Sequence, residues 1–372
     1  MTDKKHYSKS QVTKAGKILV ESENYNNKCE KDILNAFEVL SFWRSSHIIP
    51  LDIAFNRIQE IAIQIDKKAI FAKRLKRLES IKSKLIREKN MSLWRMYDIW
   101  GCRVIINSPN KLKKILRELK KWPEFLKNDW SLNIKNYIDQ PKKDWYRSVH
   151  LIWKFNEHSI EIQLRTSIQH DWATALEIVD IFTKQNLKSN QWDKVWTEFF
   201  LMVSKEFEEM EKIHLFSPNV WERVLEYYNN IKENSERHNN HRQTKRLLSK
   251  LNIIDKFLAY TISVNLANNA LSNDKLINES EGYILIQINL KEKELSTYYF
   301  NEDEDTLAEY QYTKREQRFS SDKNMIIALI ASSKIWDIKE AYPNYFADST
   351  DFIKYLHVIN QSPVKKGIFY LI

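Results

Sequence analysis

Two neighbouring stretches in which apolar and polar side chains alternate constrain the fold of this chain most. Ser148–Phe155 and Ser159–Thr166 are separated only by Asn156-Glu157-His158, and a short polar connection between two such stretches predicts a β-hairpin. A third alternating stretch, Cys102–Asn107, ends at Ser108-Pro109-Asn110 and predicts another strand. The chain is therefore expected to build a sheet.

The second hairpin strand carries three polar side chains in file. Ile160, Ile162 and Leu164 point to one face of the strand, so Glu161, Gln163 and Arg165 point to the other. A carboxylate, an amide and a guanidinium placed in this way can hold a metal ion, a hydroxyl group and a phosphate. The alternative, which this pattern alone would favour, is the ordinary polar outer face of a half-buried strand.

Helices are predicted on both sides of these strands. Apolar residues from Phe55 to Ile65 recur with helical spacing, which predicts one helix across Leu51–Lys89. Further helices are expected over 111–122, 167–180 and 191–213, and a mostly helical stretch with a polar break at 233–243 over 220–275. The remaining segments are predicted as strands over 283–290, 294–300 and 325–331 and helices over 302–318, 335–345 and 350–359.

The pattern as a whole predicts an α+β fold: a mixed β-sheet flanked by helices, followed by a helical region and a smaller α+β domain. Ser217-Pro218-Asn219 marks the main predicted boundary. We expect an N-terminal helical extension over 1–45, a catalytic domain over 46–215, a helical connector over 216–280 and a small α+β domain over 281–372.

The net charge of +10 is concentrated in one part of the chain. Residues 66–150 contain 23 Lys and Arg against 9 Asp and Glu, a local net charge of +14, so the remainder carries −4. This favours a polyanionic partner such as nucleotide phosphates, RNA or an acidic protein. The alternative is a solvated lysine-rich surface.

Composition excludes several kinds of site. With only 4 glycines, the chain contains neither GxGxxG nor GxxxxGKS/T, so any phosphate must be held largely by side chains. Cys29 and Cys102 form no metal-binding or redox motif. The start of the chain lacks the apolar core of a signal peptide, and the longest apolar runs are too short to span a bilayer. We therefore expect a cytoplasmic protein without membrane contact.

Two charged segments in the basic region suggest nucleotide chemistry. In Arg74-x-Lys76-x-x-x-Ser80-x-x-x-Lys84, followed by Arg87, the residues Ser80, Lys84 and Arg87 recur at helical spacing, which predicts a ladder of cations and a hydroxyl on one helix face. A triphosphate would neutralise them; a solvated basic helix face is the alternative. Asp98 lies where helix changes to strand, and Mg²⁺ is generally held by one or two carboxylates plus phosphate oxygens, so Asp98 and Glu161 would suffice. A helix cap is the alternative for Asp98.

Tyr137–His150 combines cations with aromatic residues. Lys142 precedes Trp145 and Tyr146, and aromatic rings of this kind stack on bases. Either ring could equally anchor the next strand in the core.

Taken in order, these segments resemble the synthetase domain of RelA/SpoT proteins and small alarmone synthetases. Five blocks carry the resemblance: Arg74–Lys84 (RxKxxxSxxxK), Asp98–Arg103 (DIxGxR), Tyr137–His150 (YIxxPK…YRSxH), Glu161–Thr166 (ExQxRT) and Gln169–Ala173 (QHxWA). One block alone would say little, whereas five in a fixed order are a specific signal.

The resemblance implies a nucleotidyltransferase-like synthetase domain that transfers the β,γ-pyrophosphate of ATP to a ribose 3′-hydroxyl and releases AMP, with Mg²⁺ as cofactor. It implies ATP binding by Arg74, Lys76, Ser80, Lys84 and Arg103, catalysis and metal binding by Asp98 and Glu161, and acceptor binding by Lys142, Tyr146, His150, Gln163 and Arg165. Within that set, Tyr146 matches the residue that stacks on the acceptor base, and Glu161 the one that activates the 3′-hydroxyl.

The chain departs from the family in its acceptor loop. Where the family reads Asn-Gly before the tyrosine, this chain has Asp144-Trp145, which leaves the acceptor open. No His/Asp cluster precedes Arg74, so we expect synthesis without the hydrolase of long family members. Glu340–Asp348 resembles a segment of stand-alone RelA/SpoT proteins, some linked to toxin–antitoxin and anti-phage systems. The C-terminal domain is then either regulatory, with a protein partner, or only a packing domain.

Three functions stay open from the sequence. The first is an alarmone synthetase that uses GDP or GTP as acceptor. The second is a toxin of a toxin–antitoxin or anti-phage system that pyrophosphorylates the tRNA 3′ end or an adenine nucleotide, with the C-terminal region as inhibitor or sensor. The positive segment and the altered loop mildly favour it. The third is a catalytically dead RNA-binding module.

Overall fold

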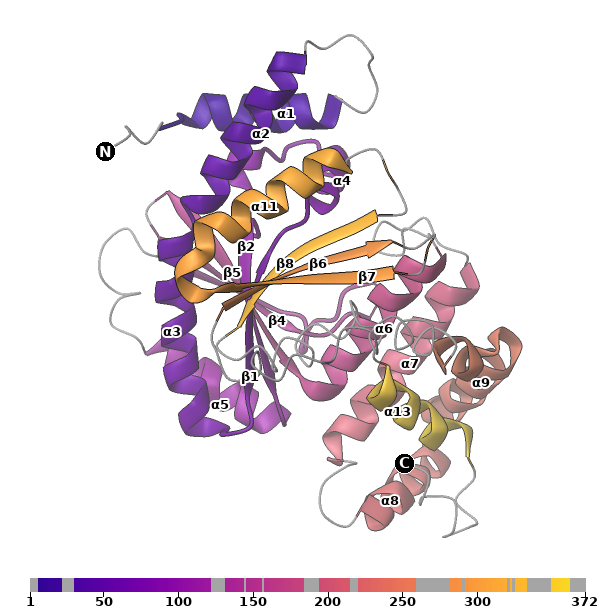
Figure 1. The fold of residues 1–372 in the computed structure, drawn as a ribbon. Coiled ribbons are helices and arrows are strands. Elements are labelled where there is room, and N and C mark those ends of the chain that lie inside the picture. Colours follow the sequence, from indigo (N-terminus) through magenta and orange to yellow (C-terminus); the bar gives the residue numbers. More distant parts are fainter. Residues whose placement is uncertain are drawn as a thin grey trace.

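One sheet of eight strands runs through the part of the chain that the computed structural model describes (Figure 1). The described residues are 6–21, 30–121, 131–143, 145–155, 157–183, 194–214, 220–258, 282–289, 292, 294–319, 322, 325–332 and 349–361. The strands are β1 (Ile70–Leu75), β2 (Trp100–Ile106), β3 (Ser131–Asn136), β4 (Val149–Phe155), β5 (His158–Thr166), β6 (Gly282–Asn289), β7 (Glu294–Asn301) and β8 (Met325–Ser332). Their order across the sheet is β3-β4-β5-β2-β1-β8-β6-β7.

Helices flank this sheet. They are α1 (Lys9–Glu21), α2 (Glu30–Ser45), α3 (Ile48–Ile65), α4 (Leu78–Arg87), α5 (Pro109–Lys120), α6 (Ser167–Thr183), α7 (Lys194–Lys212), α8 (Val220–Glu233), α9 (Ser235–Leu251), α11 (Asp305–Arg318) and α13 (Thr350–Asn360), with short 3₁₀ helices η1 (Leu93–Arg95) and η5 (Glu302–Glu304). Strands β2 and β5 are parallel, whereas the other neighbouring pairs are antiparallel. The predicted mixed sheet flanked by helices is confirmed.

The apolar face of the central strands forms the main core. Ile160, Ile162 and Leu164 of β5 are buried there as predicted, together with apolar residues of β2, and α3 and α5 pack on these two strands. Helix α5 begins at Pro109, and the Ser108 hydroxyl caps it by accepting a hydrogen bond from the Lys111 amide. The polar side chains of β5, Glu161, Gln163 and Arg165, point to the opposite face of the sheet.

A second core lies among the helices that follow the hairpin. Helices α6, α7, α8, α9 and α13 bury residues around Trp172, Phe200 and Phe352 (lower right in Figure 1). The Phe352 ring of α13 contacts Phe200 and Phe207 of α7. The predicted polar break at 233–243 is confined to Asn234, whose side chain caps α9. None of the described helices is both long and apolar enough to cross a membrane.

The predicted single helix over Leu51–Lys89 is wrong, because a strand interrupts it. Helix α3 ends before Asp66, whose side chain accepts hydrogen bonds from the amides of Lys68 and Asn107. Strand β1 then runs between β2 and β8. Its partners are distant in sequence, so the local pattern of apolar residues and cations gives no sign of it. Strand β3 was also not anticipated.

The three C-terminal strands do not form a sheet of their own. Strand β8 pairs with β1 through Lys73 with Ala331 and Arg74 with Ile330, and β6 and β7 follow it in the same sheet. The predicted strands and the helix α11 exist, but they extend the sheet that carries the polar face. The predicted boundary at Ser217–Asn219, the helix over 335–345 and the segment Glu340–Asp348 lie outside the described residues.

Candidate active site

Strand register gathers the predicted residues on the polar face of the sheet. Across β3, β4, β5 and β2, one row of paired residues contains Lys135, His150, Gln163 and Arg103. The next row places Glu161 beside Gly101, which in turn pairs with Arg74 of β1. A Cβ atom on Gly101 would lie 3.0 Å from the Glu161 carbonyl oxygen, so a larger residue there would press on the backbone of Glu161.

Asp98 is the centre of the first cluster. Lys76 Nζ donates to Asp98 Oδ2 over 2.8 Å, and Lys84 Nζ donates to Asp98 Oδ1 over 3.0 Å. Burial would raise the pKa of the Asp98 carboxyl, but the two ammonium groups outweigh it and lower that pKa. Burial lowers the pKa of Lys76, and the Tyr97 ring lies 4.2 Å from Lys84 Nζ. Asp98 is therefore an ionised carboxylate between two cations and not a helix cap.

Glu161 is the centre of the second cluster. His150 Nδ1 lies 2.9 Å from Glu161 Oε1, and Gln163 Nε2 donates to Glu161 Oε2 over 2.9 Å. Burial would raise the pKa of Glu161, but the hydrogen bond and charge of His150 outweigh it and lower that pKa to about 2. The charge of Glu161 in turn raises the pKa of Asp98, so the two carboxylates are electrostatic neighbours.

The second cluster continues to a tyrosine. The Tyr146 hydroxyl lies 2.7 Å from His150 Nε2 and accepts a hydrogen bond from Arg165 Nη2 over 2.7 Å. Burial would raise the pKa of the Tyr146 phenol, but the charges of Arg165, His150 and Lys142 lower it to about 7. Lys142 Nζ lies 4.6 Å from the centres of both the Tyr137 and the Tyr146 rings.

The loop before Tyr146 is tied to α7. Trp145 has a φ of 62°, its carbonyl oxygen accepts a hydrogen bond from Ser204 Oγ over 2.7 Å, and Lys205 Nζ lies 4.8 Å from its ring centre. Next to it, Arg147 pairs with the buried Glu211 of α7 over 2.6 Å. The Trp145 ring therefore contacts α7.

The residues of the predicted ladder, Ser80, Lys84 and Arg87, lie on the helix α4, but the two cations that precede them, Arg74 and Lys76, do not lie on a helix as predicted. Arg74 lies on β1, 4.0 Å from Glu177 of α6, and Lys76 lies in the turn after β1. Ser80 and Lys84 lie one turn apart on α4. Arg87 is half exposed and pairs with Glu88. The cations converge from a strand, a turn and a helix, while Arg87 lies apart.

Sequence reasoning missed Lys135 and Tyr97. Lys135 Nζ donates to the Tyr97 hydroxyl over 3.3 Å, and its ammonium lies 4.9 Å from the centre of that ring. Side chains two residues apart in an extended chain point to the same face. With β3 known, Lys135 would therefore have been placed on the same face as Tyr137, which is the polar face.

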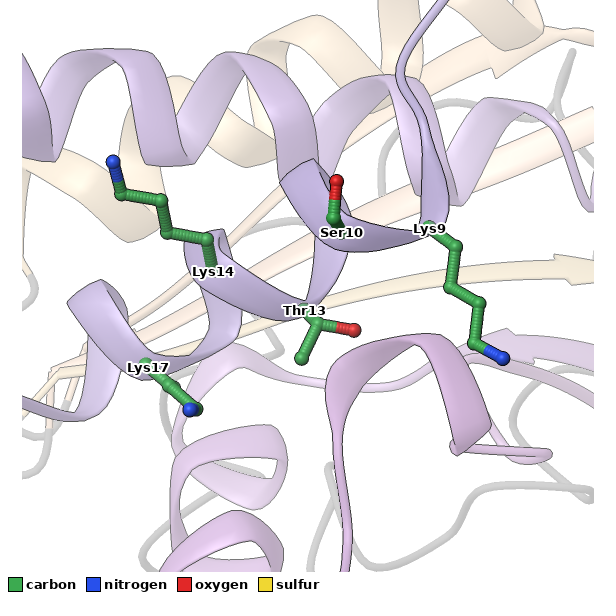
Figure 2. Close-up of a pocket in the computed structure, with 5 residues that line it drawn as sticks. All are labelled: Lys9, Ser10, Thr13, Lys14 and Lys17. Carbon is green, nitrogen blue, oxygen red and sulfur yellow. The ribbon is translucent and has the colours of Figure 1, made fainter.

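A surface recess of about 500 Å³ lies elsewhere, on α1 (Figure 2). It is lined by Lys9, Ser10, Thr13, Lys14 and Lys17. None of these residues belongs to either cluster, and exposed lysines alone do not define a site. We therefore place the candidate site at the two carboxylates.

Asp98 and Glu161 are of the residue type that Mg²⁺ takes as ligands. Both have a lowered pKa and so are ionised, and they are close enough to influence each other. Mg²⁺ prefers oxygen ligands and usually takes one or two carboxylates beside phosphate oxygens and water. Within the described ranges, no group of three or more His, Cys, Asp or Glu side chains could hold a metal ion.

A known protein family matches the part of the chain that carries this site. Residues 73–180 match the model of a family described as "Region found in RelA / SpoT proteins". This matched segment is referred to as the RelA/SpoT domain. It contains every predicted site residue from Arg74 to Arg165, whereas α2, α7 and α11 lie outside it. The family resemblance predicted from the five motifs is confirmed.

Individual relatives match parts of the chain. A rice (Oryza sativa subsp. japonica) protein named as a probable chloroplastic GTP diphosphokinase is 31% identical over 99 residues, which cover 26% of this chain and 13% of that protein. Small alarmone synthetase 1 of Bacillus subtilis, solved with its product pppGpp, matches 46% of this chain and 93% of its own at 20% identity and a TM-score of 0.36. A GTP pyrophosphokinase family protein of Streptococcus pneumoniae matches 51% and 96% at 21% identity and a TM-score of 0.33.

Proposed function

We propose that the chain is a pyrophosphokinase that transfers the β,γ-pyrophosphate of ATP to the 3′-hydroxyl of GDP or GTP and releases AMP. The observation that carries the proposal is that two charged clusters are electrostatic neighbours: Lys76 and Lys84 around Asp98, and His150 and Gln163 around Glu161. The RelA/SpoT match over residues 73–180 and the name of the rice relative support the same reaction.

On the donor side, the cations take the phosphates. Arg74, Lys76, Ser80, Lys84 and Arg103 would hold the ATP phosphates, which replace Asp98 as the anion beside the two ammonium groups. Asp98 and Glu161 would hold Mg²⁺, which when bound neutralises charge on the transferred phosphates. Phosphoryl transfer is catalysed mainly by positioning and charge stabilisation. Cations fixed on a sheet, a turn and a helix can provide both.

On the acceptor side, Glu161 orients the hydroxyl. The 3′-oxygen forms a bond to the β-phosphorus, the bond from that phosphorus to the oxygen shared with the α-phosphate breaks, AMP leaves with that oxygen, and the hydroxyl proton passes to solvent water. A carboxylate with a pKa of about 2 is a weak base, so Glu161 acts chiefly as a hydrogen-bond acceptor and a charge. Lys142, Tyr146, His150, Gln163 and Arg165 would hold the acceptor.

The same chemistry directed at a tRNA 3′ end or an adenine nucleotide is the alternative. Two observations favour it: the local charge of +14 over residues 66–150, and Trp145 fixed on α7 in the acceptor loop. In that case the chain acts as a growth-inhibiting toxin of a toxin–antitoxin or anti-phage system, with the C-terminal region as the contact for a regulatory protein.

Transfer from γ-labelled ATP to GDP, GTP, ADP or tRNA tests these proposals, with products separated by chromatography. We expect labelled 3′-pyrophosphorylated guanine nucleotide from the wild type. Glu161→Gln should lower the rate on the order of 10²–10³-fold because the carboxylate charge is lost. Glu60→Gln, at an exposed carboxylate of α3, is the matched control and should leave the rate unchanged.

The acceptor panel separates the proposals from one another. Transfer of label to tRNA or ADP, with none to GDP or GTP, would contradict the guanine-nucleotide proposal and support the alternative acceptor. No labelled product with any acceptor, together with RNA binding that survives Glu161→Gln, would contradict both and leave a binding module.

A further inference from the structure

A buried ion pair outside the RelA/SpoT domain connects two helices that are far apart in sequence. Arg44 of α2 and Glu316 of α11 lie 2.9 Å apart between Nη1 and Oε2, and their side chains are 0% and 5% exposed. Desolvation offsets much of the attraction within such a pair, so it is weak evidence for stability by itself. The role of the pair is therefore better judged from the backbone groups that it contacts.

Both partners hold the turn between β1 and α4. Arg44 Nη2 donates to the Lys76 carbonyl oxygen over 2.9 Å, and Glu316 Oε1 accepts from the Leu78 amide over 2.5 Å. Leu78 is the first residue of α4, where an amide has no partner inside the helix, and the N-cap residue Arg77 makes no side-chain cap. Glu316 therefore caps α4 from a distant helix, where its negative charge also suits the helix dipole.

This turn carries the cations of the first cluster. The Lys76 amide donates to the Ile99 carbonyl oxygen over 2.9 Å, while Arg44 holds the Lys76 carbonyl and Asp98 receives the Lys76 ammonium. Lys84 projects from α4, the helix that Glu316 caps. A shift of Arg44 or Glu316 would therefore move both lysines relative to Asp98.

Glu316 is itself held in place. The Tyr312 hydroxyl donates to Glu316 Oε1, and the Arg44 guanidinium lies 4.9 Å from the centre of the Tyr312 ring. Strand β8, from the same C-terminal region, pairs with β1 at Arg74. The C-terminal region thus supports the first cluster both at Arg74 and at the turn.

We propose that Arg44 and Glu316 are positioning residues that hold Lys76 and Lys84 in the geometry needed for the ATP phosphates. The inference rests on the proposed function. It assigns the helices α2 and α11, which lie outside the RelA/SpoT domain, a part in nucleotide affinity.

The test compares two double variants that carry the same charge. Arg44→Met with Glu316→Leu removes the pair and the cap together, which avoids an uncompensated buried charge. Arg44→Met with Glu316→Gln also removes the charges but keeps an oxygen that can accept from Leu78. We expect the first to raise the KM for ATP, and the Kd of a non-hydrolysable ATP analogue, about tenfold to a hundredfold. The second should restore part of this loss, and the KM for the acceptor should change little.

A matched control pair lies in the second core. The Tyr227 hydroxyl donates to the buried Glu206 just as Tyr312 does to Glu316, but neither residue of this pair contacts the turn. Tyr227→Phe with Glu206→Leu should therefore leave the KM for ATP and the analogue Kd unchanged, even where it lowers thermal stability.

The outcomes separate this inference from the proposed function. Folded double variants with wild-type ATP KM and analogue Kd would overturn it. A wild type that binds the analogue but transfers no label would contradict the proposed function, while the analogue Kd values still decide the positioning role. If the double variants fail to fold, Tyr312→Phe decides. It should weaken analogue binding measurably while Tyr227→Phe does not, and equal binding would overturn the inference.

Discussion

Tyr146 lies between two nitrogen-bearing side chains that favour its ionised form. Arg165 donates to its hydroxyl, His150 contacts the same oxygen, and Lys142 lies over the ring. Burial opposes ionisation, yet these charges lower the pKa of the phenol to about 7. The phenol is thus poised to change charge near neutral pH.

Titration of tyrosinate absorbance in the near ultraviolet tests this environment. The wild type should show an ionisation step with a midpoint near pH 7, and Tyr146→Phe should remove it. Because the folded-state pKa lies below the unfolded one, this group contributes stability that is full above the ordinary tyrosine pKa of 10 and is lost as pH falls through about 7. Tyr310→Phe, at an exposed tyrosine of α11, should leave the step in place, and a step that survives Tyr146→Phe would contradict the assignment.

The site residues differ in how far the sequence could predict them. Period two placed Glu161, Gln163 and Arg165 on one face because the alternation of a strand is a local property. The pairing of Asp98 with Lys76 and Lys84 could not be read in the same way, since it depends on where the turn after β1 meets the start of β2. The roles given to these residues stay predictions.

The acceptor loop, the segment before Tyr146, has backbone strain that could not be predicted from the sequence. Trp145 has a φ of 62°, in the left-handed region that favours glycine and costs other residues about 1–2 kcal/mol. The resembling family has glycine at this position. Here the tryptophan is held by Ser204 and Lys205 of α7, and these contacts offset the strain.

Two substitutions of Trp145 separate the effect of its backbone strain from the effect of its ring contact with α7. Trp145→Ala removes the ring but keeps the strained backbone, whereas Trp145→Gly removes both. Denaturant unfolding should therefore show the glycine variant to be about 1 kcal/mol more stable than the alanine variant. Both should raise the KM for the acceptor more than the KM for ATP, because the loop loses the contact of the Trp145 ring with Lys205 of α7. If the two variants were equally stable, the left-handed backbone would cost a non-glycine residue nothing here, and the strain assignment would be wrong.

The hairpin, β2 and α5 could be predicted because each carries its own signal: alternation, a Ser-Pro start or a short polar connection. Strand β1 could not, since its sequence IFAKRL shows no alternation of apolar and polar residues and its two partners, β2 and β8, come later in the chain. The three C-terminal strands were predicted as elements. Their place in the same sheet depends on the pairing of Arg74 with Ile330, for which the sequence has no local marker.

At the scale of the whole molecule, α2 and α11 meet through a second carboxylate. Glu309 of α11 is 3% exposed and accepts a hydrogen bond from Ser41 Oγ over 3.3 Å. Burial raises the pKa of Glu309 from 4.5 to about 7, although Arg44 and Ser41 act against it and Asp305 acts with it. We therefore expect the contact between α2 and α11 to depend on pH.

Glu309→Gln should change how stability depends on pH. The folded-state pKa is raised, so the contribution of Glu309 is fully present below about pH 4.5 and is lost as pH rises through about 7. Above pH 7 the glutamine variant should have a higher free energy of unfolding than the wild type, by on the order of 1–3 kcal/mol. Denaturant unfolding at several pH values measures this, with Glu294→Gln at an exposed position of β7 as control. A constant difference between variant and wild type at all pH values would contradict the assignment.

The position of β1 between β2 and β8 has a consequence for synthesis of the protein. While the ribosome has released only the first two thirds of the chain, β1 exposes the edge that later pairs with Lys73 and Arg74. Residues 325–332 must emerge before that edge is covered, and Glu316 emerges only shortly before them. A nascent chain thus carries every residue of the RelA/SpoT domain well before its donor-side cations are braced, so nucleotide binding should mature late in translation.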